Sequence, residues 1–186
     1  STFIFNDNTP YAPEGEKTNV IEQFNSLKQY DPKAKLYVVP FGKVQERIGG
    51  IIRDRFRCIF CKQLMYLVAE EIAKKEGIKA IVTGESIGQV ASQTLDNLSV
   101  LDSIAEMPIL RPLIGMNKQE IIDIARDIGT YRTSTITKGC CGFLPSNPAT
   151  KAKKEMIDKE HLHLESKIGD IRKIILDTIE EAEIIK

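Results

Sequence analysis

The residues best suited to chemistry are four cysteines, which stand as two pairs. Cys58 and Cys61 are three residues apart at the start of an expected helix, so both side chains lie on one helix face. This pair suits metal or cluster ligation or a dithiol redox couple, and the plain alternative is two buried cysteines without a chemical role. Arg55 and Arg57, together with the helix N-terminus, are expected to lower the pKa of a thiol here.

The second pair, Cys140 and Cys141, lies in a glycine-flanked loop. One CxxC is only half of a zinc site, so the remaining ligands would have to come from this loop. A thiolate at Cys141, with Lys138 nearby, could instead attack an electrophile or carry sulfur. The residues alone leave both roles open, nucleophile and ligand.

A second candidate site is the stretch from Thr83 to Leu95, TGESIGQVASQTL. An apolar strand, Ala80–Val82, runs into its glycines and an amphipathic segment with Val90, Ala91, Leu95 and Leu98 on one stripe follows it. In an open α/β sheet such a turn lies at the carboxyl end of a strand, where ligands bind, and a helix N-terminus there favours an anion. The alternative is a plain strand-to-helix turn.

The elements that must position these residues alternate between apolar strands and amphipathic helices. That order predicts an α/β fold with a doubly wound parallel sheet and helices on both faces. The expected strands are Thr2–Phe5, Leu36–Val39, Ala80–Val82 and Ile109–Leu110. A helix with an Asn117 capping box is expected to bury Ile121, Ile122, Ala125 and Ile128. We predict one domain over residues 1–150 and a C-terminal helical extension over residues 151–186.

Composition narrows the class of protein. The 26 basic and 26 acidic residues cancel, so net charge offers no bulk attraction to nucleic acid. No apolar run could span a membrane and no secretory signal is present, which favours a cytoplasmic protein with reduced thiols. His161 and His163 lie in a polar helical stretch and are expected at the surface without a catalytic role.

Four segments together resemble one family. They are TGESIGQVASQTLDNL from Thr83, LRPLIG from Leu110, KQEIIDIARDIGTY from Lys118 and CCGFLPSNPATK from Cys140. In that order they are similar to the adenylating domain of the tRNA 4-thiouridine synthetases, tRNA sulfurtransferases that are also tied to thiamine thiazole synthesis.

The resemblance implies an adenine-nucleotide α-hydrolase-like fold of the PP-loop kind, with ATP and Mg²⁺ adenylating a tRNA uridine before a protein persulfide delivers sulfur. Cys141 falls on the catalytic cysteine of the family. The positions that fall on nucleotide contacts are Phe5, Asn6, Lys62, Gly84 and Gln93. Lys62 stands where many members carry an arginine. The lysine keeps the positive charge but lacks the planar guanidinium that can donate two parallel hydrogen bonds.

The chain also departs from the family pattern. The Ser-Gly-Gly-x-Asp-Ser phosphate loop is absent, as are the RNA-binding domains and a rhodanese-type sulfur domain. The CxxC is similar to that of archaeal-type members, which implies an iron–sulfur cluster or zinc held by Cys58, Cys61 and Cys140. The alternative to an enzyme is a catalytically degenerate nucleotide-binding or iron–sulfur-binding module.

These departures predict an incomplete domain. In the family the first strand lies between the strands that match Thr2–Phe5 and Ala80–Val82, so we expect a complementing N-terminal segment or chain and weak ATP binding without it. The other expected partners are tRNA through a separate or missing domain, a persulfide donor protein and a second copy in a homodimer.

Overall fold

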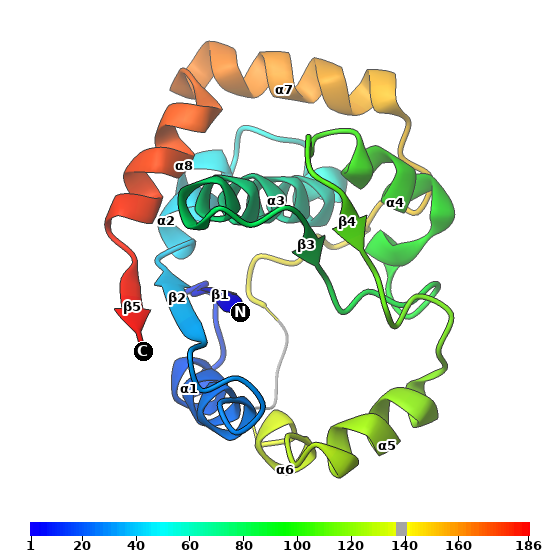
Figure 1. Ribbon diagram of the computed structural model, residues 1–186. Helices are drawn as coiled ribbons and strands as arrows, with labels where there is room; N and C mark the ends of the chain where they lie inside the picture. Colours follow the sequence, from blue (N-terminus) through cyan, green and yellow to red (C-terminus); the bar gives the residue numbers. More distant parts are fainter. Residues whose placement is uncertain (137–140) are drawn as a thin grey trace.

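The computed structural model describes residues 1–136 and 141–186, which form a mixed α/β fold (Figure 1). One sheet has the order β1-β2-β5, in which β1 (Thr2–Asn6) pairs parallel to β2 (Lys35–Val39) and β5 (Glu183–Ile185) pairs antiparallel to β2. A second sheet pairs β3 (Ile81–Val82) parallel to β4 (Ile109–Leu110). The parallel pairs agree with the predicted α/β fold, and the antiparallel β5 was not predicted.

The helices cover both sides of these strands. In Figure 1, α3 and α7 lie above the strands and α1, α5 and α6 lie below them. The helices are α1 (Glu16–Leu27), α2 (Gly42–Ile48), α3 (Arg57–Glu76), α4 (Leu95–Asp102), α5 (Lys118–Asp127), α6 (Tyr131–Ser134), α7 (Lys154–Ile168) and α8 (Ile171–Glu180), with 3₁₀ turns at Asp54–Phe56 and Ala91–Gln93.

The long helix α3 forms the centre of the larger core. Most of its apolar residues are buried in a core shared with β2, α2, α4, α7 and α8, and Gly77 ends it in the left-handed conformation that glycine adopts readily. A smaller core around Phe24, Leu36 and Val38 packs under α1 on the other side of the first sheet. The first turns of α3, which carry Cys58 and Cys61, are therefore held on a rigid support.

The C-terminal extension packs onto the same core. Ile157 and Leu164 of α7 and Ile175 of α8 are fully buried there, and β5 extends the first sheet. His161 was expected at the surface, but its Nε2 lies 2.8 Å from Gln63 Oε1 and its ring packs on Phe60. Burial lowers the pKa of His161, because the charged imidazolium is disfavoured away from water.

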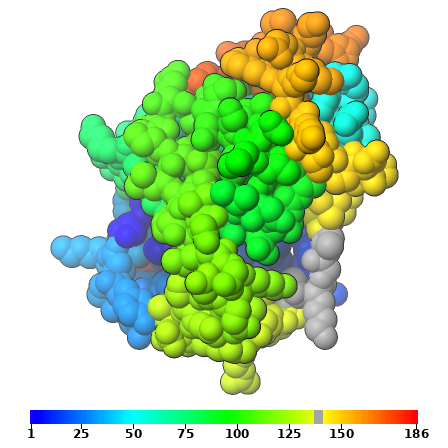
Figure 2. All heavy atoms as spheres, turned by 90° about the vertical axis from the view of Figure 1, so that its right-hand side faces the viewer, coloured from blue at the N-terminus to red at the C-terminus, as the bar shows by residue number. Residues whose placement is uncertain are grey.

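Helix α5 keeps its predicted start but not its predicted burial. Asn117 and Glu120 form the capping box, yet no residue of α5 is fully buried. Ile121 and Ile128 are half-buried, because no described element covers all of the apolar face. The space-filling view shows the α4–α5 segment (green) spread over one side of the molecule, with α7 (orange) across the top (Figure 2).

Within the described residues, no helix is both long and apolar enough to cross a membrane.

Candidate active site

Three cysteines from distant parts of the chain line one cavity of about 510 Å³, which we call the thiol pocket. Cys58 and Cys61 come from the first turns of α3, and Cys141 comes from the loop after α6. The remaining lining residues are Asn8, Gln45, Lys62, Met65, Val90, Ala91, Ser92, Phe143, Leu144, Pro145 and Pro148. The structure thus joins the CxxC, the glycine-rich stretch and Cys141 in one site.

The Cys141 loop is held by contacts on both sides of the cysteine. The backbone N–H of Gly142 donates to the carbonyl of Tyr11 at 2.8 Å, and the buried ring of Phe143 packs on the Tyr11 ring. The Arg57 guanidinium lies over the Phe143 ring, 5.1 Å from the ring centroid. These contacts fix Cys141 against the segment that follows β1.

That segment in turn depends on a close approach at Gly42. The N–H of Gly42 donates to the carbonyl of Asp7 at 2.9 Å, and a Cβ on Gly42 would lie 1.7 Å from the Thr9 carbonyl oxygen. No side chain fits there, so glycine is required for the β1 loop to reach Cys141.

The predicted lowering of the thiol pKa is wrong for the CxxC pair. Burial raises the pKa of Cys58, and it raises that of Cys61 to about 12. The two arginines have other partners, because Arg57 pairs with Asp54 at 3.1 Å and Arg55 lies over the Phe56 ring. Desolvation therefore dominates, and both cysteines are thiols at neutral pH.

Gln45 of α2 joins two of the three cysteines. Its side chain is fully buried, and its Nε2 lies 3.7 Å from Cys61 Sγ and 3.8 Å from Cys141 Sγ. Neither Gln45 nor Asn8 belongs to a sequence motif, so the sequence analysis did not select them as site residues. Only the fold brings these carboxamides to the sulfurs.

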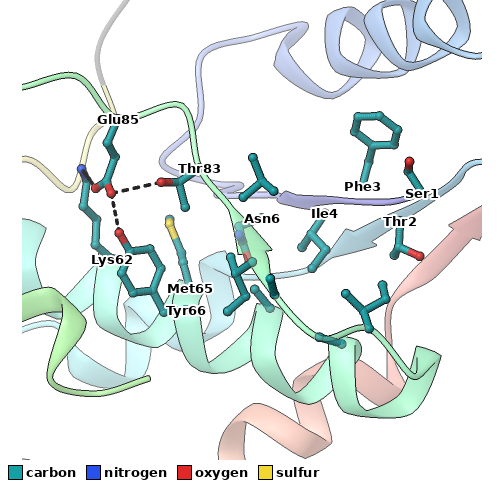
Figure 3. Close-up of a pocket in the computed structure, with 16 residues that line it drawn as sticks. Ser1, Thr2, Phe3, Ile4, Asn6, Lys62, Met65, Tyr66, Thr83 and Glu85 are labelled. Carbon is teal, nitrogen blue, oxygen red and sulfur yellow. Dashed lines mark hydrogen bonds and ion pairs between the residues drawn. The ribbon is translucent and has the colours of Figure 1, made fainter. Parts of the chain in front are cut away.

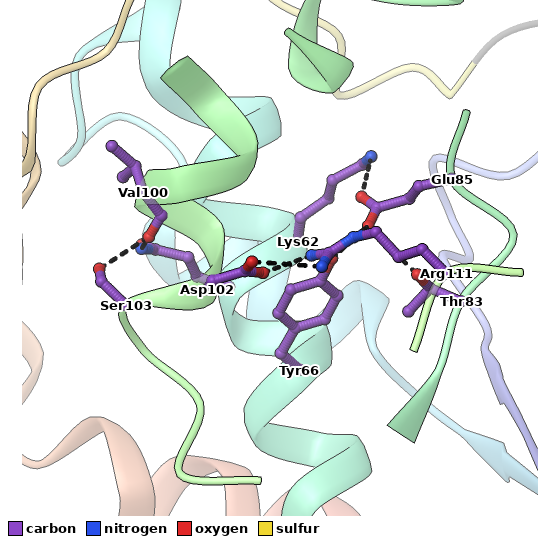
Figure 4. Close-up of polar contacts among 9 residues, drawn as sticks. Lys62, Tyr66, Thr83, Glu85, Val100, Asp102, Ser103 and Arg111 are labelled. Carbon is purple, nitrogen blue, oxygen red and sulfur yellow. Dashed lines mark hydrogen bonds and ion pairs between the residues drawn. The ribbon is translucent and has the colours of Figure 1, made fainter. Parts of the chain in front are cut away.

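A buried carboxylate at the end of β3 organises the neighbouring wall (Figure 4). Glu85 accepts hydrogen bonds from Lys62 Nζ at 2.8 Å and Arg111 Nε at 2.8 Å, and from the Tyr66 hydroxyl at 2.6 Å. Burial opposes ionisation of Glu85, but these donors outweigh it and lower its pKa to about 2. Arg111 also pairs with Asp102, so the charges of this cluster, which we call the Glu85 network, are compensated.

A second cavity of about 690 Å³ separates the two sheets, and we call it the strand groove (Figure 3). One side is β1, with Thr2, Ile4 and Asn6, and the other is β3 together with α3. Neither β1 nor β3 has a strand on this side among the described residues. Lys62 and Met65 line both cavities, so they form the wall between the strand groove and the thiol pocket.

The predicted nucleotide residues are distributed over these features. Asn6 and Lys62 line the strand groove. Gly84 is exposed two residues after the end of β3, and Gln93 has a buried Oε1 without a partner among the described residues. Phe5 packs on the smaller core instead and lines neither cavity.

The described residues do not fit a metal centre. Within residues 1–136 and 141–186, no three histidine, cysteine or carboxylate side chains converge as metal ligands would. A nitrogen of Gln45 lies between two of the sulfurs, and a cation there would face that donor. The third predicted ligand, Cys140, lies outside the described residues.

Comparison with known proteins gives a consistent match. The model of the thiamine biosynthesis protein (ThiI) family matches residues 1–165. A probable tRNA sulfurtransferase of Halothermothrix orenii is 38% identical over 95% of this chain and 44% of its own length. One from Clostridium perfringens is 40% identical over 97% of this chain and 46% of its own.

Among solved structures, a 4-thiouridine synthetase in complex with RNA and bound ATP superimposes with a TM-score of 0.87 at 31% identity. It covers 100% of this chain, which corresponds to 47% of that protein. The chain therefore spans about half the length of the relatives it matches.

Proposed function

Because the chain belongs to the ThiI family, we propose that it is the part of an ATP-dependent tRNA sulfurtransferase that carries the reactive cysteine and one wall of the nucleotide site. The proposed reaction is 4-thiouridine synthesis, in which ATP adenylates the uridine O4 and sulfur from a Cys141 persulfide displaces AMP. The name of the RNA- and ATP-bound relative and those of the sulfurtransferase relatives support this reaction. The link to thiamine synthesis rests on the family description.

The observation that carries the proposal is the gathering of three thiols beside Val90, Ala91 and Ser92, in the glycine-rich stretch that follows β3. A persulfide on Cys141 that attacks C4 leaves the base joined to Cys141 through a disulfide. A second thiol must then attack Cys141 Sγ to release the thiolated base and form a protein disulfide. Cys58 fits that step best, because it lines the same pocket and is more exposed than Cys61.

For the nucleotide, we propose contacts from Asn6, Lys62, Gly84 and Gln93, with Mg²⁺ accompanying the phosphates. Phe5 keeps its proposed place near the adenine only if a ligand reaches the end of β1, since its ring packs on the smaller core. Lys62 is paired with Glu85, so it would act as a fixed, partly neutralised charge rather than a mobile one.

Further partners belong to the same proposal. tRNA would bind through a domain outside this chain, and a persulfide donor protein would load Cys141 in the cytoplasm. A complementing strand would fill the strand groove, and a homodimer remains a prediction. Iron–sulfur or zinc ligation by Cys58, Cys61 and Cys140 also remains a prediction, and the metal content of anaerobically purified protein would test it.

The central experiment replaces the proposed nucleophile. In the natural full-length protein, Cys141→Ser is expected to abolish sulfur transfer to tRNA and to leave ATP binding intact. Asn147→Ala, an exposed change in the same loop, serves as the control and should keep activity. Thiolation by the serine variant at the wild-type rate would remove Cys141 from the mechanism.

A further inference from the structure

Asn97, in the first turn of α4, has a fully buried side chain whose hydrogen-bond partners all lie outside that helix. Its Nδ2 donates to the carbonyl of Ala91 at 2.7 Å and to that of Ala149 at 2.8 Å. Its Oδ1 accepts from the N–H of Ala152 at 3.0 Å. These partners fix the orientation of the carboxamide, because only its nitrogen can donate to two carbonyls. One side chain therefore joins the glycine-rich stretch to residues that follow the Cys141 loop.

Residues 146–152 form what we call the anchor segment, which is held at both ends. At its start, the N–H and the hydroxyl of Ser146 donate to Asp54 Oδ2 at 3.0 and 2.9 Å. At its end, the Thr94 hydroxyl donates to the carbonyl of Thr150 at 2.7 Å. Asp54 lies in the turn directly before α3 and Thr94 caps α4, so the anchor segment joins the starts of these two helices.

The anchor segment supports Cys141 on its C-terminal side. Four residues separate Cys141 from Ser146, and within them the Leu144 N–H donates to the Cys141 carbonyl at 3.1 Å, so the connection is short and turned back on itself. Cys141 and Ala91 both line the thiol pocket, whereas Asn97 lines neither the thiol pocket nor the strand groove. Asn97 can therefore affect the sulfur only through the residues that it holds.

We propose that Asn97 is a positioning residue for sulfur transfer, which sets the place of Cys141 relative to the nucleotide side of the site. Reacting atoms must approach to about 3–3.5 Å, and a misplacement of about 1 Å can cost about a hundredfold in rate. The inference rests on the proposed function, since it assigns Asn97 a part in that same reaction.

Loss of the Asn97 carboxamide should disturb the thiol side of the site more than the nucleotide side. The anchor segment would lose the two bonds that Ala149 and Ala152 make with it. The glycine-rich stretch would lose one bond but keep others of its own, including that of the Gly88 N–H to the Gln93 carbonyl at 3.0 Å. Sulfur transfer should therefore be slowed while ATP still binds.

The test is Asn97→Leu in the natural full-length protein, since leucine is close in volume and makes none of the three hydrogen bonds. Thiolation of tRNA is measured against ATP concentration, at a temperature at which the variants and the wild type are fully folded. We expect kcat to fall at least about tenfold and KM for ATP to stay within about threefold of wild type. Iodoacetamide should alkylate Cys141 at least about threefold faster, because its loop has lost part of its support.

Gln63→Leu is the matched control. Gln63 is also a fully buried carboxamide, and it bonds to the Val100 carbonyl at 3.0 Å and to His161 at 2.8 Å, neither of which belongs to the anchor segment. Both substitutions leave buried polar groups without partners, so both should lower the free energy of unfolding. Only Asn97→Leu is expected to slow sulfur transfer and to expose Cys141.

Equal losses of kcat in the two leucine variants, or an unchanged kcat in a folded Asn97→Leu, would overturn the inference. If Asn97→Leu does not fold, Thr94→Val decides, because it removes the bond to Thr150, and kcat should then fall at least about threefold. If Cys141→Ser is inactive and Asn97→Leu is not slowed, only this inference falls. If Cys141→Ser still thiolates tRNA, the proposed function falls and the inference falls with it.

Discussion

Glu85 is the carboxylate that pairs with both positive side chains of its network, Lys62 and Arg111. It accepts from Lys62, Tyr66 and Arg111 while almost fully buried, and these donors lower its pKa to about 2. The ionised form therefore stabilises the folded state above the ordinary carboxyl pKa, and this stabilisation is lost as the pH falls toward 2. At neutral pH it contributes about 3 kcal/mol to the free energy of unfolding.

Glu85→Gln is expected to remove that contribution and the pH dependence that goes with it. Urea unfolding at pH 7 should show a loss of about 3 kcal/mol, and the difference from wild type should shrink as the pH falls below about 4.5. Glu165→Gln, an exposed change on α7, controls for the loss of one charge. An equal difference at pH 7 and pH 3 would show that the charge of Glu85 does not stabilise the fold.

The thiols should differ in reactivity. Burial raises the pKa of Cys61 to about 12, so its thiolate is scarce at pH 8. With limiting iodoacetamide, Cys61 is expected to be alkylated far more slowly than Cys141, as measured by peptide mass spectrometry. Labelling in urea provides the reference, and equal rates in the folded protein would contradict the protective effect of burial.

At the level of residues, the sequence allowed candidates to be selected by type but did not allow their environment to be predicted. Cys58, Cys61 and Cys141 were recognised because sulfur chemistry is specific to cysteine. The thiol pKa was predicted in the wrong direction, because the positive neighbours were visible in the sequence and the burial was not. Asn8 and Gln45 were missed, because an isolated carboxamide gives no signal until the fold brings it to a cavity.

At the scale of elements, the link between β1 and α2 depends on a backbone contact. A Cβ on Gly42 would overlap the Thr9 carbonyl oxygen, so Gly42→Ala must displace the β1 loop and its contact with the Cys141 loop. We expect a loss of about 1–3 kcal/mol in the free energy of unfolding, as for other overpacked sites, and a changed alkylation rate at Cys141.

The matched control for that change is Gly115→Ala, where a Cβ would meet no atom within 4 Å. Thermal unfolding of both variants and alkylation of Cys141 make the comparison. If the two alanine variants behave alike, the close approach at Gly42 does not hold the loop.

The sequence predicted elements well where the signal is local. The capping box of α5 follows from neighbouring residues alone, Asn117 and Glu120. The helix expected around Val90 begins only at Leu95, because Thr94 caps it by accepting from the Asn97 N–H, and Val90 and Leu95 are exposed. Strand β5 was missed because its pairing with β2 joins residues far apart in the chain.

At the scale of the whole molecule, the two sheets remain apart. The strand groove lies between β1 and β3, and each strand presents an unpaired edge to it among the described residues. Unpaired edges of this kind accept an added strand through main-chain hydrogen bonds. The strand groove is therefore where we expect the predicted complementing strand to bind.

The 186-residue chain is therefore expected to bind ATP weakly, since little in it would cradle the phosphates. Calorimetry with ATP should show a marked gain in affinity when the strand and phosphate loop of a longer relative are joined upstream of Ser1. In a control fusion, the glycines of the phosphate loop are replaced. This control keeps the added strand but removes the loop's contacts with the phosphates. Low-micromolar affinity of the unextended chain would show the argument to be wrong.

The wall shared by the two cavities has a thermodynamic consequence. Lys62 and Met65 contact whatever fills the strand groove and whatever enters the thiol pocket. Lys62 is already held by Glu85, so if one occupant fixes the Met65 side chain, the second binds without repeating that entropy cost. The two binding events are then linked, and by reciprocity each must strengthen the other by the same factor.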